Sequence, residues 1–249
     1  MDIGHQGKQG EECELCAFNN PKGTATAVVI RDGKVLLLRR GEEPFKGQWD
    51  FPGGYTNYRE TPEQALAREL REELGVEAKL TFITALPGTG HWKEKSFAVI
   101  VSAYLADIGD QEIKLNHENS NAAWILVREL DPAALAFDSN QALGRLVKEK
   151  FDFDLARVRE LIHELDASAT VREHALYRAV LAGHVERIYD GEKLIGMGWI
   201  FPRQTLLRHQ DVVEDMIIDY GYLVRGLGRK ILDVIVNWEK EKGVEVIEL

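Results

Sequence analysis

The chain has 249 residues, of which 45% are hydrophobic and 29% charged, so it is long enough for one large or two modest globular domains. Its formal net charge of −10 argues against a broad nucleic-acid or acidic-membrane surface and favours a small-molecule partner. Cysteine is too scarce for a disulfide framework, and no signal-peptide pattern or membrane-length apolar run is seen. We therefore expect a cytoplasmic protein, and the sequence leaves its oligomeric state open, a homodimer included.

Two apolar runs open the predicted fold, from Thr24 to Arg31 and from Val35 to Arg39. Between them lies Asp32-Gly33, a dipeptide that favours the tight turn of a β-hairpin. The fold is therefore predicted to begin with antiparallel strands.

A loop rich in glycine and proline, from Gly41 to Gly54, leads to a predicted helix. Thr61 suits the N-cap position, Pro62 the first turn and Gln64 the third position of a capping box. Gly75 supplies the stop signal, because glycine readily adopts the left-handed conformation that ends helices.

Later elements alternate between strand and helix patterns. Together they predict an α/β protein with two domains and a boundary near residues 150–168. The predicted strands are Lys79–Leu86, Phe97–Leu105, Ala122–Val127 and Val212–Asp219, and the predicted helices are Glu63–Leu74, Ser139–Lys150, Leu155–Leu165 and a helix that runs to Lys240.

Three carboxylates share one face of the first predicted helix. Glu69, Glu72 and Glu73 fall within an arc of about 100°, since successive helical residues turn by about 100°. Leu66 and Leu70 lie on the neighbouring arc, and their burial would fix the direction of the acids. Two interpretations follow: a solvated acidic surface, or a site for a hard divalent cation, which prefers oxygen ligands.

The residues around these acids favour the second interpretation. From Gly54 to Val76 the chain matches the Nudix box, Gly-x5-Glu-x7-Arg-Glu-U-x-Glu-Glu-x-Gly-U, in which U is a bulky apolar residue. Glu60 and Arg68 occupy the isolated glutamate and the arginine of the motif. Residues 47–54 and 135–140 also resemble family segments, so residues 24–150 are identified as resembling a Nudix hydrolase domain.

The resemblance implies an α/β/α sandwich with a mixed sheet. It also implies Mg²⁺, with Mn²⁺ as the alternative, and hydrolysis of the diphosphate in a nucleoside diphosphate linked to another group. Glu69 and Glu73 are the expected metal ligands, with a carbonyl at Gly54, and Glu72 is either a third ligand or the group that orients water. Arg68 is expected to hold the carboxylates without touching the metal.

Candidate substrate contacts outside the box each have an ordinary structural alternative. Glu118 is an additional acid or a surface glutamate, and Arg39 and Arg40 are phosphate ligands or a solvated strand end. Trp49, Phe51 and Tyr55 are base-stacking residues, or else core residues or loop anchors. The sequence does not choose among ADP-ribose, other nucleotide sugars, dinucleotides, coenzyme A and oxidised nucleoside triphosphates.

The first 23 residues contain Cys13-Glu14-Leu15-Cys16, which resembles the second half of the zinc ribbon that precedes some Nudix domains. A structural zinc needs four ligands, and only His5 is an obvious supplement. We therefore expect a degenerate ribbon with free thiols rather than bound zinc.

Residues 169–249 are expected to form a second, smaller α+β domain after a helical linker at 151–168. The run from Val212 to the end resembles part of the acetyl-coenzyme A binding core of the GNAT superfamily of N-acetyltransferases. The expected ligand-binding residues are Val224, Arg225, Gly226, Gly228 and Arg229. Two departures stand against acetyl transfer: Leu223 replaces the usual Gln or Arg, and the resemblance stops before the segment with the general-acid tyrosine. Acyl-coenzyme A binding without catalysis, a degenerate interaction module, a shortened domain and an acyltransferase regulated by the Nudix half stay open.

Overall fold

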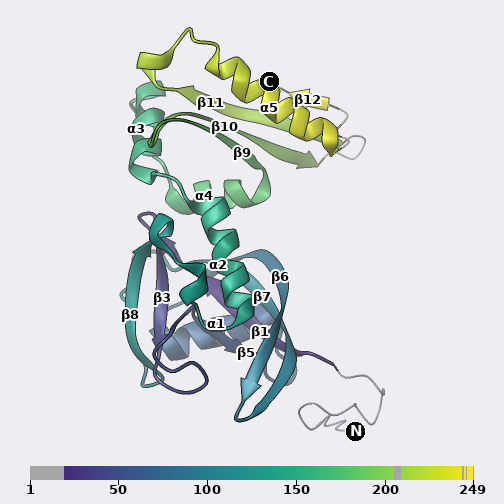
Figure 1. Ribbon diagram of the computed structural model, residues 1–249. Helices are drawn as coiled ribbons and strands as arrows, with labels where there is room; N and C mark the ends of the chain where they lie inside the picture. Colours follow the sequence, from purple (N-terminus) through teal and green to yellow (C-terminus); the bar gives the residue numbers. More distant parts are fainter. Residues whose placement is uncertain (1–19, 205–208, 243, 245, 249) are drawn as a thin grey trace. The chain divides into compact units, whose positions relative to one another are not determined.

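The computed structural model describes residues 20–204, 209–242, 244 and 246–248. The chain divides into two compact units, Met1–Glu149 and Lys150–Leu249. Unit 1 contains most of the strands (Figure 1), and its elements in chain order are β1 (Lys22–Val28), β2 (Ile30–Arg31), β3 (Lys34–Arg40), β4 (Trp49–Asp50), β5 (Gly53–Tyr55), α1 (Pro62–Leu74), β6 (Lys79–Trp92), β7 (Lys95–Asp107), β8 (Asn119–Leu126), the 3₁₀ turns η1 (Val127–Glu129) and η2 (Pro132–Ala134), and α2 (Asp138–Phe151).

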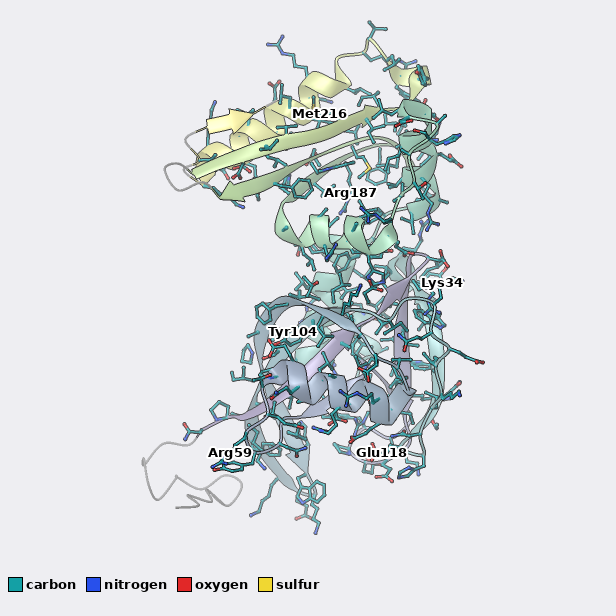
Figure 2. The ribbon with its side chains drawn as sticks, turned by 180° about the vertical axis from the view of Figure 1, so that it is seen from behind. Lys34, Arg59, Tyr104, Glu118, Arg187 and Met216 are labelled. Carbon is teal, nitrogen blue, oxygen red and sulfur yellow. The ribbon has the colours of Figure 1, made fainter. Side chains whose placement is uncertain are left out.

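Unit 1 has two sheets. The first has the strand order β5-β1-β7-β6, in which β1 and β7 are parallel and the other pairs antiparallel. The second is antiparallel, with β3 between β2 and β8 and also paired with β4. In Figure 1 α2 lies in front of these strands and α1 behind them, and the reverse view in Figure 2 has α1 in front. These layers and the mixed first sheet confirm the expected α/β fold class.

The predicted hairpin turn is present, but the first apolar run divides between the two sheets. Asp32 and Gly33 both have positive φ, 51° and 69°, and join β2 to β3. β1 ends at Val28 and pairs in the first sheet, whereas β2 begins at Ile30 in the second. The single strand predicted from Thr24 to Arg31 is therefore wrong. Both pieces are buried, so the apolar pattern continues across the break.

Strand β6 is six residues longer than predicted. It continues through Pro87, Gly88 and Gly90 to Trp92. These residues resemble a turn signal, but β6 is the edge strand of its sheet, where proline leaves no ladder hydrogen bond unmade. Its extension forms a long hairpin with β7 beside the cavity described below.

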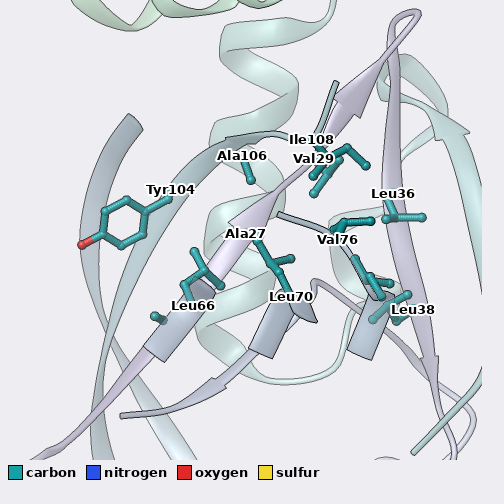
Figure 3. Close-up of a cluster of buried hydrophobic side chains, with 12 residues drawn as sticks. Ala27, Val29, Leu36, Leu38, Leu66, Leu70, Val76, Tyr104, Ala106 and Ile108 are labelled. Carbon is teal, nitrogen blue, oxygen red and sulfur yellow. The ribbon is translucent and has the colours of Figure 1, made fainter. Parts of the chain in front are cut away.

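A buried cluster joins α1 to both sheets of unit 1 (Figure 3). Leu66 and Leu70 of α1 are fully buried, and they share the cluster with Ala27 of β1 and with Leu36 and Leu38 of β3. Each buried leucine contributes on the order of 2 kcal/mol through removal of apolar surface from water. This packing fixes the rotation of α1 and therefore the direction of its polar face.

Unit 2 combines one sheet with helices. Strands β11 and β12 are parallel and the other neighbours antiparallel, in the order β12-β11-β10-β9. Its core includes Ile231 and Ile235 of the last helix against this sheet. Its elements are α3 (Leu155–Leu165), α4 (Glu173–Ala182), β9 (His184–Asp190), β10 (Lys193–Gln204), β11 (His209–Ile218), the 3₁₀ turn η3 (Tyr220–Tyr222), α5 (Leu227–Glu241) and β12 (Val246–Glu248).

Residues 151–168, expected as a linker, contain α3, which is integrated into unit 2. Its Leu155, Val158 and Leu161 are buried. Arg157 on the same helix donates to Asp219 Oδ2 (2.5 Å) and to the Leu194 carbonyl (3.1 Å). Among the described residues, no helix has the length and apolar character needed to cross a membrane.

Candidate active site

Helix α1 begins and ends as the sequence predicts. The Thr61 hydroxyl accepts from the Gln64 amide (3.3 Å), and the Gln64 side chain accepts from the Thr61 amide (2.9 Å), which completes the capping box. Gly75 ends the helix with φ 68° and donates to the Arg71 carbonyl. With both ends fixed and the leucine face buried, the glutamates are held in one direction.

Arg68 is the centre of a hydrogen-bond network that links the acids of α1 to the preceding loop. Its Nε donates to Glu60 Oε1 (2.9 Å), and its Nη1 donates to Glu69 Oε1 (2.8 Å) and Glu72 Oε2 (3.1 Å). Its Nη2 donates to the Tyr55 carbonyl (2.9 Å). Hydrogen bonds from Arg68 and from a backbone amide lower the pKa of Glu60 to about 2. All three acids therefore share one guanidinium, and Arg68 is saturated by protein groups.

Glu73 is the most buried acid of the helix, with 9% of its surface exposed. Its Oε2 accepts from the Gly53 amide (2.9 Å) and its Oε1 from Asn119 Nδ2 (3.1 Å). Burial nevertheless raises the pKa of Glu73 to about 8. Burial also raises the pKa of Glu69. Burial therefore disfavours the charged form of both carboxylates, and the ion pair described for them is the one between Arg68 and Glu69.

The loop before β8 is attached to the end of α1 and carries Glu118 to the site. The Lys114 amide donates to the Leu74 carbonyl (2.7 Å), and the Asn116 amide donates to the Glu73 carbonyl (3.1 Å). Figure 2 shows Glu118 beyond one end of α1. Glu118 is also close enough to Glu69 to contribute to the raised pKa of that residue. The loop thus adds a fourth carboxylate to the group.

These acids line a cavity of about 720 Å³. Glu69, Glu72, Glu73 and Gly54, the expected metal-binding residues, all line it, as do Arg68 and Glu118. Phe51 lines it too but is only 4% exposed, so it is mainly a core residue. Arg39 and Trp49 are not among its lining residues within the described part of the chain; Arg39 instead lies over the Trp49 ring, 6.0 Å from its centroid.

The donor set fits a hard divalent cation. The candidate ligands are oxygen atoms, which such cations prefer. A bound cation would also stabilise the negative charge of Glu69 and Glu73, which burial disfavours. In the residues that the structure describes, no three acids are yet close enough to hold a metal ion together. Arg68 and Asn119 hold three of them apart, so metal binding would require small side-chain movements.

Asp50 and Asn140 form a buried pair at the cavity wall that the sequence did not indicate. Asn140 donates to Asp50, and Arg40 forms an ion pair with the same carboxylate (2.9 Å). Burial raises the pKa of Asp50 to about 6, although Arg40 opposes this. The sequence likewise did not predict the hydrogen bond from Asn119 to Glu73. These contacts span 46 and 90 residues, and no local pattern encodes them.

In unit 2 the turn before α5 has the predicted glycine geometry. Gly226 is the N-cap of α5 with φ 72°, and Val224 also has positive φ (60°) and is fully exposed. A Cβ at Gly226 or Gly228 would meet no atom within 4 Å. Arg225 and Arg229 are exposed on either side. The candidate zinc ligands Cys13, Cys16 and His5 lie outside the described residues.

Helix α1 is packed against both sheets of unit 1 and carries acids that Arg68 holds, the arrangement that a Nudix-type hydrolase requires. The family model described as "NUDIX domain" matches residues 21–149, just over half of the chain. The chain therefore belongs to the Nudix family, and it is a hydrolase.

Two curated relatives illustrate the range of similarity. The chain is 27% identical over 133 residues to the ADP-ribose pyrophosphatase of Methanocaldococcus jannaschii, a match that covers 53% of this chain and 77% of that protein. It is 43% identical over 75 residues to the CTP pyrophosphohydrolase of Escherichia coli K12, covering 30% of this chain and 53% of that protein.

Two solved structures are similar to unit 1. The MutT NUDIX hydrolase from Burkholderia pseudomallei is 25% identical with a TM-score of 0.44, and the match covers 52% of this chain and 97% of that one. The NUDIX domain of Shewanella oneidensis NrtR, complexed with ADP ribose, is 27% identical with a TM-score of 0.42, covering 52% and 91%.

Proposed function

We propose that unit 1 hydrolyses the diphosphate linkage of a nucleoside diphosphate joined to another group, with Mg²⁺ or Mn²⁺ as cofactor. The observation that supports this most is the cavity whose lining includes the three glutamates of α1 and Glu118. The names of the relatives, ADP-ribose pyrophosphatase and CTP pyrophosphohydrolase, belong to the same reaction class.

We assign the cation to Glu69, Glu73 and the Gly54 carbonyl, with Glu118 as an additional acid. When bound, the cation supplies charge neutralisation for the phosphates and makes water more acidic. Glu72 is 56% exposed and has a single Arg68 contact, so it is free to orient the attacking water and take its proton. Arg68 positions the acids and does not touch the reacting atoms.

Rigid positioning suits this chemistry, because phosphoryl transfer depends mainly on alignment and electrostatic stabilisation. The Arg68 network and the docked loop at 114–119 keep the carboxylates near one another, so that only small side-chain movements are needed to bind the cation.

The test is a panel of substrates in the presence of Mg²⁺ or Mn²⁺: ADP-ribose, other nucleotide sugars, dinucleotides, coenzyme A and nucleoside triphosphates. Masses of the products show which phosphorus is attacked when the reaction runs in ¹⁸O-labelled water. Metal-dependent release of a nucleoside monophosphate supports the proposal. Absence of turnover across the whole panel would contradict it.

A second candidate function belongs to unit 2, where we propose a site for the pyrophosphate of an acyl-coenzyme A. Gly226 and Gly228 precede and begin α5, and no protein atom occupies the space beside them. Gly226 has the left-handed φ of 72° that glycine readily adopts, and the open space beside both glycines leaves the backbone accessible to a ligand. Calorimetry with coenzyme A tests this, and wild-type protein that releases no binding heat would contradict it.

A further inference from the structure

One face of the sheet β5-β1-β7-β6 forms the floor of the cavity. Paired residues on adjacent strands point to the same face, and residues two apart on one strand share it. Tyr55 pairs with Thr24, Thr24 pairs with Val101, and Phe97 on β7 pairs with Gly90 on β6. Residues of this face from all four strands line the cavity, among them Thr24, Tyr55, Gly90, Trp92, Phe97 and Val101.

The same cavity extends past the edge strand β5 to the acids of α1. β5 is the edge of the sheet, and it supplies both Tyr55 to the floor and Gly54 beside Glu69. The Tyr55 carbonyl is held by Arg68 (2.9 Å). A substrate whose phosphates lie at the acids therefore has the floor as its next protein surface.

Three aromatic side chains make this floor suitable for a planar group. The Tyr55 and Phe97 rings are stacked, with centroids 6.3 Å apart and planes at 29°. Gly90, opposite Phe97, leaves room for that ring, since a Cβ there would lie 2.6 Å from it. Trp92 is two residues beyond Gly90 on the same face and is therefore a diagonal neighbour of Phe97.

Trp92 is 60% exposed. Within the described part of the chain it has no aromatic or cationic partner at its ring, and it belongs to no buried cluster. An exposed tryptophan among the residues that line this cavity leaves a large apolar surface in water, which a ligand is able to cover.

The rings of a second aromatic group at the cavity wall already contact other side chains of the protein. The Phe45 ring meets His91 and Phe137 edge-on, at 5.3 and 4.9 Å. Arg40 lies over the Phe137 ring, 4.9 Å from its centroid. These rings hold one another and the loop at 41–48, so they offer less free π surface than Trp92. The Phe97 ring is also partly covered, by Tyr55 and by the Lys22 ammonium 5.4 Å from its centroid.

We propose that the nucleobase of the substrate stacks on Trp92, beside Phe97, in this cavity. The inference rests on the proposed function for the identity of the ligand, and it assigns recognition of the base to the floor of the sheet. Stacking accepts any base, because every base has a π face. The site therefore selects nucleotides over diphosphates that carry no base, without choosing strongly among the four bases.

Direct binding tests the base site independently of turnover. Each of the four nucleoside monophosphates is titrated into wild-type protein and into Trp92→Phe and Trp92→Ala, with ribose 5-phosphate as the ligand that lacks a base. We expect the nucleotides to quench tryptophan fluorescence in the wild type and to lose that quenching in Trp92→Phe. Removal of the ring in Trp92→Ala should weaken their binding about tenfold or more and leave ribose 5-phosphate unaffected.

Tyr58→Ala is the matched control, since Tyr58 is 65% exposed but does not line the cavity. It should bind every ligand as the wild type does. Equal quenching in Trp92→Phe, equal weakening of ribose 5-phosphate binding in Trp92→Ala, or no nucleotide binding by the wild type would overturn the inference. Protein that binds the monophosphates at Trp92 but hydrolyses no diphosphate would overturn the proposed function and leave the base site standing.

Discussion

The carboxylate of Glu69 lies in the space that a side chain at position 54 would fill. A Cβ built on Gly54 would be 2.5 Å from the Glu69 Cδ. The glycine of the motif is therefore required by a neighbouring acid, while its own φ lies outside the left-handed region. This relationship gives a test of the site that changes no charge.

We expect Gly54→Ala to push the Glu69 carboxylate away and to lower metal-dependent turnover by roughly 10- to 100-fold, the range found when groups that position metal ligands are removed. The fold should survive, since the displaced atoms end a flexible side chain. Steady-state kinetics and thermal unfolding measure the two effects separately. Gly53→Ala is the contrasting variant: its Cβ would collide with the Ala25 carbonyl, and its φ is 145°, so it should lose stability as well as activity.

Glu73→Gln keeps the shape of the side chain and removes its negative charge. Because Glu73 is assigned as a metal ligand, turnover should fall at least about 100-fold, more than for loss of an outer group. Circular dichroism should be unchanged. Glu77→Gln provides the control, because Glu77 is exposed and contacts only Arg71 among the charged groups described. Wild-type activity in Glu73→Gln would refute the assignment.

Asn119 holds Glu73 from the opposite side to Gly53. We expect Asn119→Ala to reduce kcat by roughly 10- to 100-fold and to raise the Mg²⁺ concentration needed for half-maximal rate. Asn121→Ala, on the exposed part of the same strand, should behave as the wild type. If Asn119→Ala alters only thermal stability, with kinetics and Mg²⁺ dependence intact, the residue has a purely structural role.

Asp50 makes stability depend on pH in a defined window. Its pKa is raised by burial to about 6, against 3.8 for an ordinary aspartate, so the folded protein binds this proton more tightly than the unfolded chain. Its contribution is therefore fully present below about pH 4 and is lost as pH rises through 6, by up to roughly 3 kcal/mol.

Denaturant unfolding of the wild type and Asp50→Asn from pH 4 to pH 7 isolates this contribution. The wild type should lose stability relative to the variant across the interval, because the variant cannot ionise. The Arg40 ion pair forms only as Asp50 ionises, so its contribution is already contained in the pKa of about 6 and is not a separate offset. Parallel curves for the two proteins would show that Asp50 keeps an ordinary pKa.

Local patterns were sufficient for the helix that carries the acids. Thr61, Gln64 and Gly75 specify its ends through contacts within a few residues, and the structure contains each of those contacts. The leucine spacing also predicted which face is buried. The direction in which the acids of α1 point could therefore be predicted from the sequence of this helix and its caps alone.

The rest of the site depends on distant parts of the chain. Asn119 and Glu73 are 46 residues apart, and nothing near either residue predicts their hydrogen bond. The end of β6 was missed because Pro87 and Gly88 resemble a turn, while the edge position of the strand tolerates both. Trp92 thus fell outside the predicted elements. The break at Val29 was hidden because both sides of it are equally buried.

The two faces of strand β1 have different roles: one packs beneath α1, and the other lines the cavity. Ala25 and Ala27 pack in the cluster that holds α1, whereas Thr24 and Thr26, on the opposite face, line the cavity. Substitutions on one face would change which molecules are admitted, and substitutions on the other would change how firmly the catalytic helix is held. Substitutions at alternate positions of this one strand are therefore able to change the substrate of the enzyme without changing the residues that cleave it.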